Sequence, residues 1–206
     1  MKIRRIYLDL DDVCNTLSMH FLSLVGCKIS PTDYSEYPIT GNVDLTLVAN
    51  KLLGGEYFTR PSFWSWFNRQ DWAGVPESPQ YPWVLEQCER LVGRENIIIA
   101  TSPTKDPACA AGKVDWIHAH FPEWMHRSYA ITPRKWFFAQ SGSLLVDDNE
   151  KNCRLFRRYG GQALLVPRPW NRLHRCSTSM YLVEGFGRLL ARQGEFRVAG
   201  QKSAQL

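Results

Sequence analysis

Three carboxylates follow a short apolar segment near the N-terminus. Asp9, Asp11 and Asp12 come directly after the run Ile6–Leu8, a pattern typical of a buried strand that brings acidic groups to the edge of a sheet. Side chains alternate along a strand, so we expect Asp9 and Asp11 to point the same way. Adjacent carboxylates repel one another, so such a pair indicates a bound cation, a shared proton or a catalytic role. A bound divalent metal is the simplest explanation.

Two later apolar segments also end in polar groups. Ile97–Ala100 leads into Thr101–Ser102, and Leu144–Val146 leads into Asp147–Asp148. In an open parallel α/β sheet, ligands bind at the carboxyl ends of the strands, and carboxylates with phosphate oxygens suit Mg²⁺. The combination indicates phosphoryl chemistry: one carboxylate attacks phosphorus and a second handles the protons, while a metal and a lysine neutralise charge.

Strands and helices alternate through the elements that must position these groups. The periodicity predicts helices over 15–24, 43–53, 83–92, 113–121 and 151–159, and further strands at 129–131 and 163–166. This order predicts an α/β fold, a Rossmann-like parallel sheet with helices on both faces.

A Pro- and Gly-rich, aromatic segment interrupts this pattern. We predict a core formed by residues 1–24 and 83–193, a small cap formed by 25–82 and inserted after the first strand, and a flexible polar tail over 194–206. The cap aromatics Phe58, Phe63 and Trp64 either stack on a nucleobase or only pack the cap onto the core. Both alternatives stay open for each ring.

Composition sets the broad class of the protein. A chain of 206 residues fits one domain with an insertion. Its net charge of +5 favours anionic substrates or weak nucleic-acid contact, and nucleic-acid binding is the more distant alternative. Six scattered cysteines without CxxC spacing indicate reduced thiols rather than disulfides or zinc. Residues 1–5 are too short for a signal peptide, and no apolar stretch approaches the ~20 residues of a membrane span. We expect a cytoplasmic protein, with a homodimer as a candidate assembly.

In chain order, these motifs resemble those of the haloacid dehalogenase-like (HAD) phosphatases. The motifs are Asp9–Val13, the strand ending at Thr101–Ser102, a downstream lysine, and the strand ending at Asp147–Asp148. The strings Phe63–Trp64, Thr-Ser-Pro and Lys113–Ile117 are also similar to the 5′(3′)-deoxyribonucleotidase family. The resemblance covers roughly residues 3–170, and it implies a magnesium-dependent phosphatase for pyrimidine deoxyribonucleotides.

The resemblance also implies roles for the acids. Asp9 would be the nucleophile and a Mg²⁺ ligand. Asp11 would be the general acid and base, and its backbone carbonyl would bind the metal. Asp148, with Asp147 beside it, matches the metal-binding acid of the family.

Two hydroxyl side chains and one lysine are the candidates for phosphate binding. The resemblance assigns Thr101 and Ser102 to the phosphoryl oxygens and Lys135 to the phosphate-binding lysine. Lys105 and Lys113 could reach the same place, and Lys113, placed at the start of a helix, could instead orient an acid. Thr101 could also be only the N-cap of the next helix.

Two positions depart from the family pattern. Asp12 stands where the family usually has glycine, so its carboxylate either crowds the phosphate or turns to solvent. Leu17 stands where the family often presents an aromatic residue near the base. Two functional alternatives therefore remain: a phosphatase for another small phosphate ester, and a nucleotide-binding protein with impaired catalysis.

Overall fold

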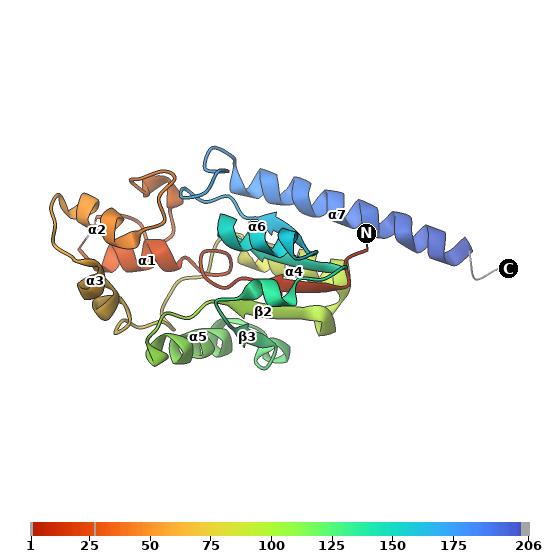
Figure 1. The fold of residues 1–206 in the computed structure, drawn as a ribbon, viewed down its shortest axis with the longest axis horizontal. Helices are drawn as coiled ribbons and strands as arrows, with labels where there is room; N and C mark the ends of the chain where they lie inside the picture. The colour runs from red at the N-terminus through yellow and green to blue at the C-terminus, as the bar shows by residue number, and fades with distance from the viewer. Residues whose placement is uncertain (1, 27, 203–206) are drawn as a thin grey trace.

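A parallel sheet forms the centre of the molecule (Figure 1). The computed structural model describes residues 2–26 and 28–202, with side chains as far as residue 194. Within these residues the sheet has five strands, all paired in parallel, in the order β3-β2-β1-β4-β5. The strands are β1 (Arg5–Leu8), β2 (Ile97–Thr101), β3 (Tyr129–Ile131), β4 (Ser143–Asp147) and β5 (Gln162–Leu165). The predicted α/β fold with a parallel sheet is confirmed.

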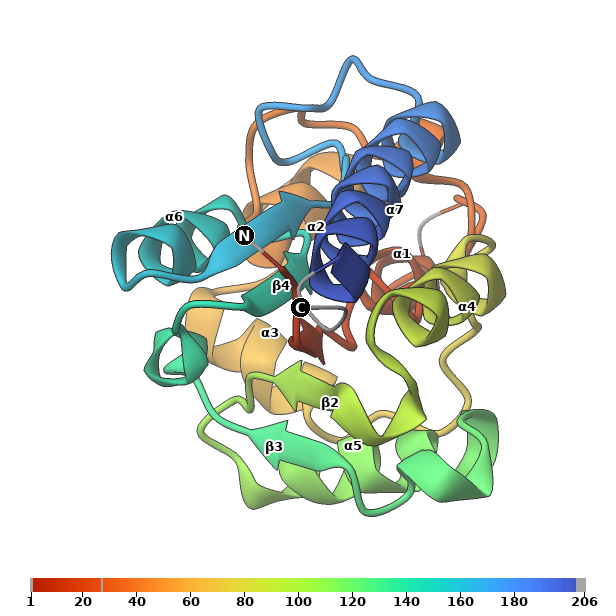
Figure 2. The same ribbon diagram turned by 90° about the vertical axis from the view of Figure 1, so that its right-hand side faces the viewer.

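Residue alternation along the strands creates two apolar faces. Ile6 and Leu8 of β1 belong to a large cluster with side chains of α4 (Tyr81–Val92), α5 (Pro107–His120) and α7 (Thr178–Lys202). Tyr7 belongs to a smaller cluster on the other face, where it stacks on Phe138 at 4.9 Å and contacts α6 (Glu150–Arg158). Figure 2 shows α4 and α7 on one side of the sheet and α6 on the other. Helices therefore cover both faces, as predicted.

Three helices lie beyond the carboxyl ends of the strands (Figure 1). They are α1 (Leu17–Leu24), α2 (Leu45–Leu53) and α3 (Arg60–Phe67). Phe21 of α1 packs against Phe67 of α3 at 4.1 Å and against Trp72 at 5.3 Å. Because these side chains belong to the same apolar cluster as the sheet, the division into core and cap at residues 24 and 83 stays a prediction.

Some elements differ from the sequence prediction. Helix α3 was not expected; Thr59 and Ser62 form a capping box at its start. Helix α5 begins at Pro107 rather than at Lys113. The C-terminal segment contains several glycines, which disfavour helix, yet α7 packs against α4 and continues to Lys202. The flexibility expected over 194–206 stays a prediction, and residues 203–206 lie outside the described residues.

The cysteines of the described residues are all free thiols, as expected: Cys14, Cys88, Cys109, Cys153 and Cys176. Cys27 lies outside the described residues. Over the described part of the chain, no helix combines the length and apolar character needed to cross a membrane.

Candidate active site

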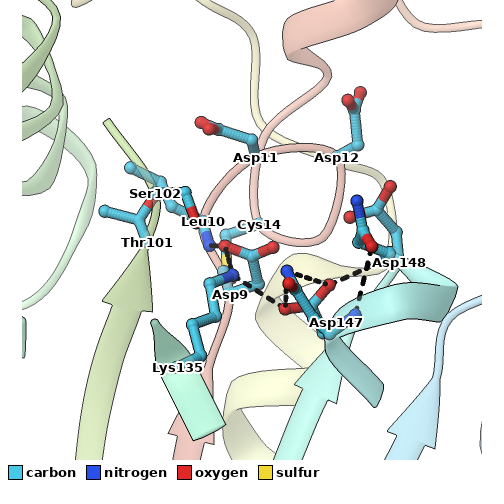
Figure 3. A network of polar contacts seen from close by, with 12 residues as sticks. Asp9, Leu10, Asp11, Asp12, Cys14, Thr101, Ser102, Lys135, Asp147 and Asp148 are labelled. Carbon is cyan, nitrogen blue, oxygen red and sulfur yellow. Dashed lines mark hydrogen bonds and ion pairs between the residues drawn. The ribbon is translucent and has the colours of Figure 1, made fainter. Parts of the chain in front are cut away.

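The first acidic motif turns sharply after β1. The strand ends at Leu8, and residues 11–14 form a turn. Asp9 points toward Lys135 and Asp147, whereas Asp11 points away from them (Figure 3). The expectation that Asp9 and Asp11 point the same way is therefore wrong, because alternation holds only for extended backbone.

Lys135 joins two of the acidic strand ends. It lies in a short 3-10 helix (Lys135–Phe138) before β4 and is 1% exposed. Its Nζ lies 2.6 Å from Asp9 Oδ1 and 2.7 Å from Asp147 Oδ2. Burial alone would lower the pKa of this ammonium group, but the two carboxylates raise it above its usual value. Lys135 is therefore a fixed positive charge beside Asp9.

Three buried carboxylates form a cluster at this edge of the sheet. Asp9, Asp147 and Asp148 each offer an oxygen, and these atoms all lie within 4.8 Å of one another. Burial, together with repulsion from Asp147, raises the pKa values of Asp9 and Asp148 well above their usual range. One lysine does not balance three acids, so the cluster favours a further cation.

Asp147 differs from Asp9 and Asp148 in how many of its carboxylate oxygens accept hydrogen bonds. Both oxygens of Asp147 accept hydrogen bonds, including 2.7 Å from the Asn149 backbone N–H and 3.1 Å from Asn152 Nδ2. Asp9 Oδ2 and Asp148 Oδ1, in contrast, accept no hydrogen bond from any described residue. In both carboxylates the other oxygen is the one that accepts. Two open carboxylate oxygens on adjacent strand ends fit the oxygen ligands that Mg²⁺ prefers. The residues present therefore fit a magnesium ion.

A second lysine organises the opposite side of the site. Lys113, also 1% exposed, forms an ion pair with Asp11 and donates a hydrogen bond to Thr101 Oγ1 at 3.1 Å. It lies within α5 rather than at its start. The N-cap of α5 is Asp106, so the alternative that Thr101 only caps this helix is excluded. Ser102 Oγ donates to the Thr132 carbonyl at 3.3 Å.

Asp12 neither crowds the cluster nor faces solvent. It is 5% exposed, with φ of 56°, in the left-handed region. Its carboxylate accepts hydrogen bonds from the backbone N–H and hydroxyl of Ser18, at 3.0 and 2.5 Å, and from the hydroxyl of Tyr34 at 2.9 Å. Burial raises the pKa of this carboxyl to about 6, although the Ser18 hydrogen bonds oppose the rise. The alternative that Asp12 turns to solvent is therefore wrong, because the side chain ties the turn to α1 and to Tyr34.

The backbone conformation of Asp12 leads to a stability prediction. We expect Asp12→Ala to be less stable than Asp12→Gly by about 1–2 kcal/mol, because both lose the hydrogen bonds but only alanine retains a Cβ in the left-handed region. Urea unfolding of the two variants measures this difference. Equal stabilities would show that the turn relaxes away from positive φ.

The candidate base-binding residues lie in different surroundings. Leu17 and Phe63 are buried in the apolar core, at 8% and 0% exposed, so neither presents a face that a base could reach. Phe58 packs edge-on against Phe63, with 5.6 Å between the ring centroids. Trp64 instead lines an open groove of about 680 Å³ between α3 and the loop after β2. The other lining residues are Arg60, Pro61, Asn68, Pro103, Thr104 and Lys105.

The segment after β5 carries site residues that the sequence analysis missed. Trp170 donates its indole N–H to Asp148 Oδ2 at 2.6 Å, and Asn171 Nδ2 donates to the Asp148 carbonyl at 2.9 Å. Arg168 donates to the Asp12 carbonyl at 2.7 Å. One signal was available: the segment follows a strand of the parallel sheet, and so begins at the edge where the acids lie.

Comparison with protein families identifies the chain. The family model described as 5′ nucleotidase, deoxy (pyrimidine), cytosolic type C protein matches residues 2–181. The chain belongs to this 5′ nucleotidase family. It is accordingly a phosphomonoester hydrolase of the HAD type, and the resemblance drawn from its motifs is confirmed.

One solved structure agrees on the fold, and a second is similar at a lower score. A HAD family hydrolase from Deinococcus radiodurans R1, crystallised with phosphate and sodium, is 14% identical with a TM-score of 0.50; the match covers 84% of this chain and 87% of that one. The HAD hydrolase YfnB from Bacillus subtilis, bound to magnesium, is 9% identical with a TM-score of 0.48, covering 81% and 87%. No curated protein matches the sequence.

Proposed function

We propose that this nucleotidase is Mg²⁺-dependent and hydrolyses pyrimidine deoxyribonucleoside monophosphates through an aspartyl-phosphate on Asp9. The observation that carries the proposal is the environment of Asp9. One of its oxygens is held by Lys135 and the Leu10 backbone N–H, at 2.6 and 2.8 Å, and the other is open. A nucleophile needs such an arrangement, with its position fixed and one oxygen available for attack.

The two steps of the reaction follow from the two acids. Asp9 Oδ2 attacks phosphorus, the bond from phosphorus to the nucleoside oxygen breaks, and Asp11, acting as general acid, transfers a proton to that oxygen. Asp11 then takes a proton from water, which attacks phosphorus, releases inorganic phosphate and regenerates Asp9. Lys113 holds the Asp11 carboxylate beside Thr101. Lys113 and Thr101 supply donors for the phosphoryl oxygens, and Ser102 does so once its hydroxyl turns away from the Thr132 carbonyl.

The Asp9 carboxylate and the open oxygen of Asp148 would hold the magnesium ion, together with the backbone carbonyl of Asp11. When bound, the ion neutralises charge on the phosphoryl group. Asp147 acts differently, because its oxygens are occupied by Lys135, Asn149 and Asn152. It keeps Lys135 in place.

The groove beside Trp64 supports a nucleotide as substrate. It lies against the loop that continues from Thr101 and Ser102, and Thr104 Oγ1 donates to Asn68 Oδ1 at 2.9 Å, linking this loop to α3. Trp64 presents a ring on which a base can stack, a contact typically worth ~1–3 kcal/mol. Among the four candidate residues for the base, we assign the role to Trp64.

Phosphate release from dUMP, dTMP, dAMP and sugar phosphates, with and without Mg²⁺, tests the proposal. We expect turnover only with Mg²⁺ and a preference for dUMP and dTMP. We expect Trp64→Ala to lower kcat/KM for dUMP about tenfold without affecting sugar phosphates, as the loss of one stacked base predicts. Equal turnover of sugar phosphates would favour the alternative of another phosphate ester. No turnover of any phosphomonoester would favour the alternative of a nucleotide-binding protein.

A further inference from the structure

Trp170 lies between an acid of the site and the segment that precedes α2. Its indole N–H donates to Asp148 Oδ2 at 2.6 Å, and both residues are 8% exposed. The opposite oxygen of Asp148 is the open one. The indole hydrogen bond therefore fixes which carboxylate oxygen faces Asp9 and Asp147.

The indole ring is itself held by two tyrosines from residues 28–44. Tyr34 packs edge-on against it, with 5.8 Å between ring centroids, and Tyr37 contacts it at 5.0 Å. Each tyrosine is fixed at its hydroxyl: Tyr34 donates to Asp12 Oδ1 at 2.9 Å and Tyr37 to the Asn42 carbonyl at 2.8 Å. Rotation of the indole away from Asp148 would disturb both aromatic contacts.

A neighbouring residue ties the same segment to the first acidic loop. Arg168, 2% exposed, donates to the Asp12 carbonyl at 2.7 Å, and its guanidinium lies 4.3 Å from the centre of the Tyr34 ring. Residues 168–170 thus contact both loops that carry acids of the site, as well as Tyr34. A displacement of this segment would move Asp148 relative to Asp9.

We propose that Trp170 is a positioning residue, which holds Asp148 so that its open oxygen is directed at the cation. The inference rests on the proposed function, because it assigns Asp148 to the magnesium ion. Hydrogen-bond partners of metal-ligating carboxylates orient the ligand, and their loss typically costs ~10–100-fold in metal affinity or activity. Trp170 does this through a single N–H, and Tyr34 and Tyr37 keep the ring in place.

Trp170→Phe tests the proposal, because phenylalanine retains an aromatic ring against the tyrosines and lacks the N–H. Mg²⁺ affinity is measured by isothermal titration calorimetry on the full chain, alongside kcat for dUMP at increasing Mg²⁺ and the urea unfolding midpoint. We expect the Mg²⁺ dissociation constant to rise about tenfold. We also expect kcat to recover toward the unchanged protein at saturating Mg²⁺, which a general structural defect would not allow.

Trp83→Phe is the matched control. Trp83 packs against Phe186 between α4 and α7, with 5.6 Å between ring centroids, and has no contact with the acids. We expect its Mg²⁺ affinity to be unchanged. If Trp170→Phe does not fold, Tyr37→Leu provides the test in its place. It keeps the indole N–H but loosens the ring, and we expect Mg²⁺ binding to weaken by less than the ~10–100-fold that loss of the hydrogen bond typically costs.

Two results would overturn the inference. A folded Trp170→Phe that binds Mg²⁺ as tightly as the unchanged protein would show that the indole does not position Asp148, as would a loss of kcat that saturating Mg²⁺ does not restore. Failure of the proposed function is distinguishable. In that case the unchanged protein itself would bind no Mg²⁺ in the calorimeter and release no phosphate from dUMP. That result would overturn both the proposed function and the role of Trp170.

Discussion

Asp9→Asn is expected to abolish phosphate release and leave the fold intact. An amide oxygen does not attack phosphorus, so turnover should fall by about a thousandfold or more, equivalent to about 4 kcal/mol of transition-state stabilisation. The substitution is close in size to aspartate, and its oxygen can still accept from Lys135 and the Leu10 N–H. It also removes one charge from a cluster in which burial and like charges disfavour the carboxylate. The urea unfolding midpoint should therefore stay the same or rise.

Acid-quenched trapping of ³²P-labelled protein provides the second measurement for Asp9. The unchanged enzyme should retain label from substrate as an acyl phosphate, and Asp9→Asn should retain none. Asp115→Asn is the matched control, because Asp115 is exposed on α5 and forms no ion pair with a described residue. It should behave as the unchanged enzyme. Phosphate release by Asp9→Asn at a normal rate would contradict the covalent mechanism.

The sequence was sufficient to predict that the polar residues at the ends of three strands lie close together. This prediction needs only the apolar pattern of each strand and one rule of parallel-sheet topology. Short apolar runs marked β1, β2 and β4, and parallel strands place their carboxyl ends at one edge. That was sufficient to bring Asp9, Thr101 and Asp147 together. Lys135 was assigned by the family resemblance, as the phosphate-binding lysine. The structure pairs it with Asp9 and Asp147, and its role in phosphate binding stays a prediction.

The remaining features depend on contacts between distant parts of the chain. The direction of Asp11 follows from a turn within the motif, and its partner Lys113 comes from α5. Asp12 is explained by Ser18 and Tyr34, neither of which carries a recognisable signal. Trp170 meets Asp148 across 22 positions of sequence. Local periodicity contains no information about such pairs, so these orientations could not be predicted from sequence alone.

Lys135→Met is expected to destabilise the fold and reduce catalysis together. It leaves Asp9 and Asp147 buried beside Asp148 without their shared cation, and breaking a buried ion pair typically costs about 3–5 kcal/mol. Loss of one charge-stabilising donor typically lowers kcat by about 10²–10³-fold. Urea unfolding and dUMP turnover measure the two effects. Lys151→Met, on the exposed surface of α6, is the matched control and should change neither.

Two further measurements show whether Lys135→Met loses stability through charge repulsion or through lost packing: unfolding with added Mg²⁺, and unfolding of the double variant with Asp147→Asn. If repulsion among the acids causes the instability, Mg²⁺ at 100 times its dissociation constant should restore about 2.7 kcal/mol, because the ion binds only the folded state. Adding Asp147→Asn should restore stability without Mg²⁺, since it removes the carboxylate that Lys135 contacts at 2.7 Å. Loss of packing alone would respond to neither. A Lys135→Met protein insensitive to both would contradict the role of Lys135 as the cation that holds this acidic cluster together.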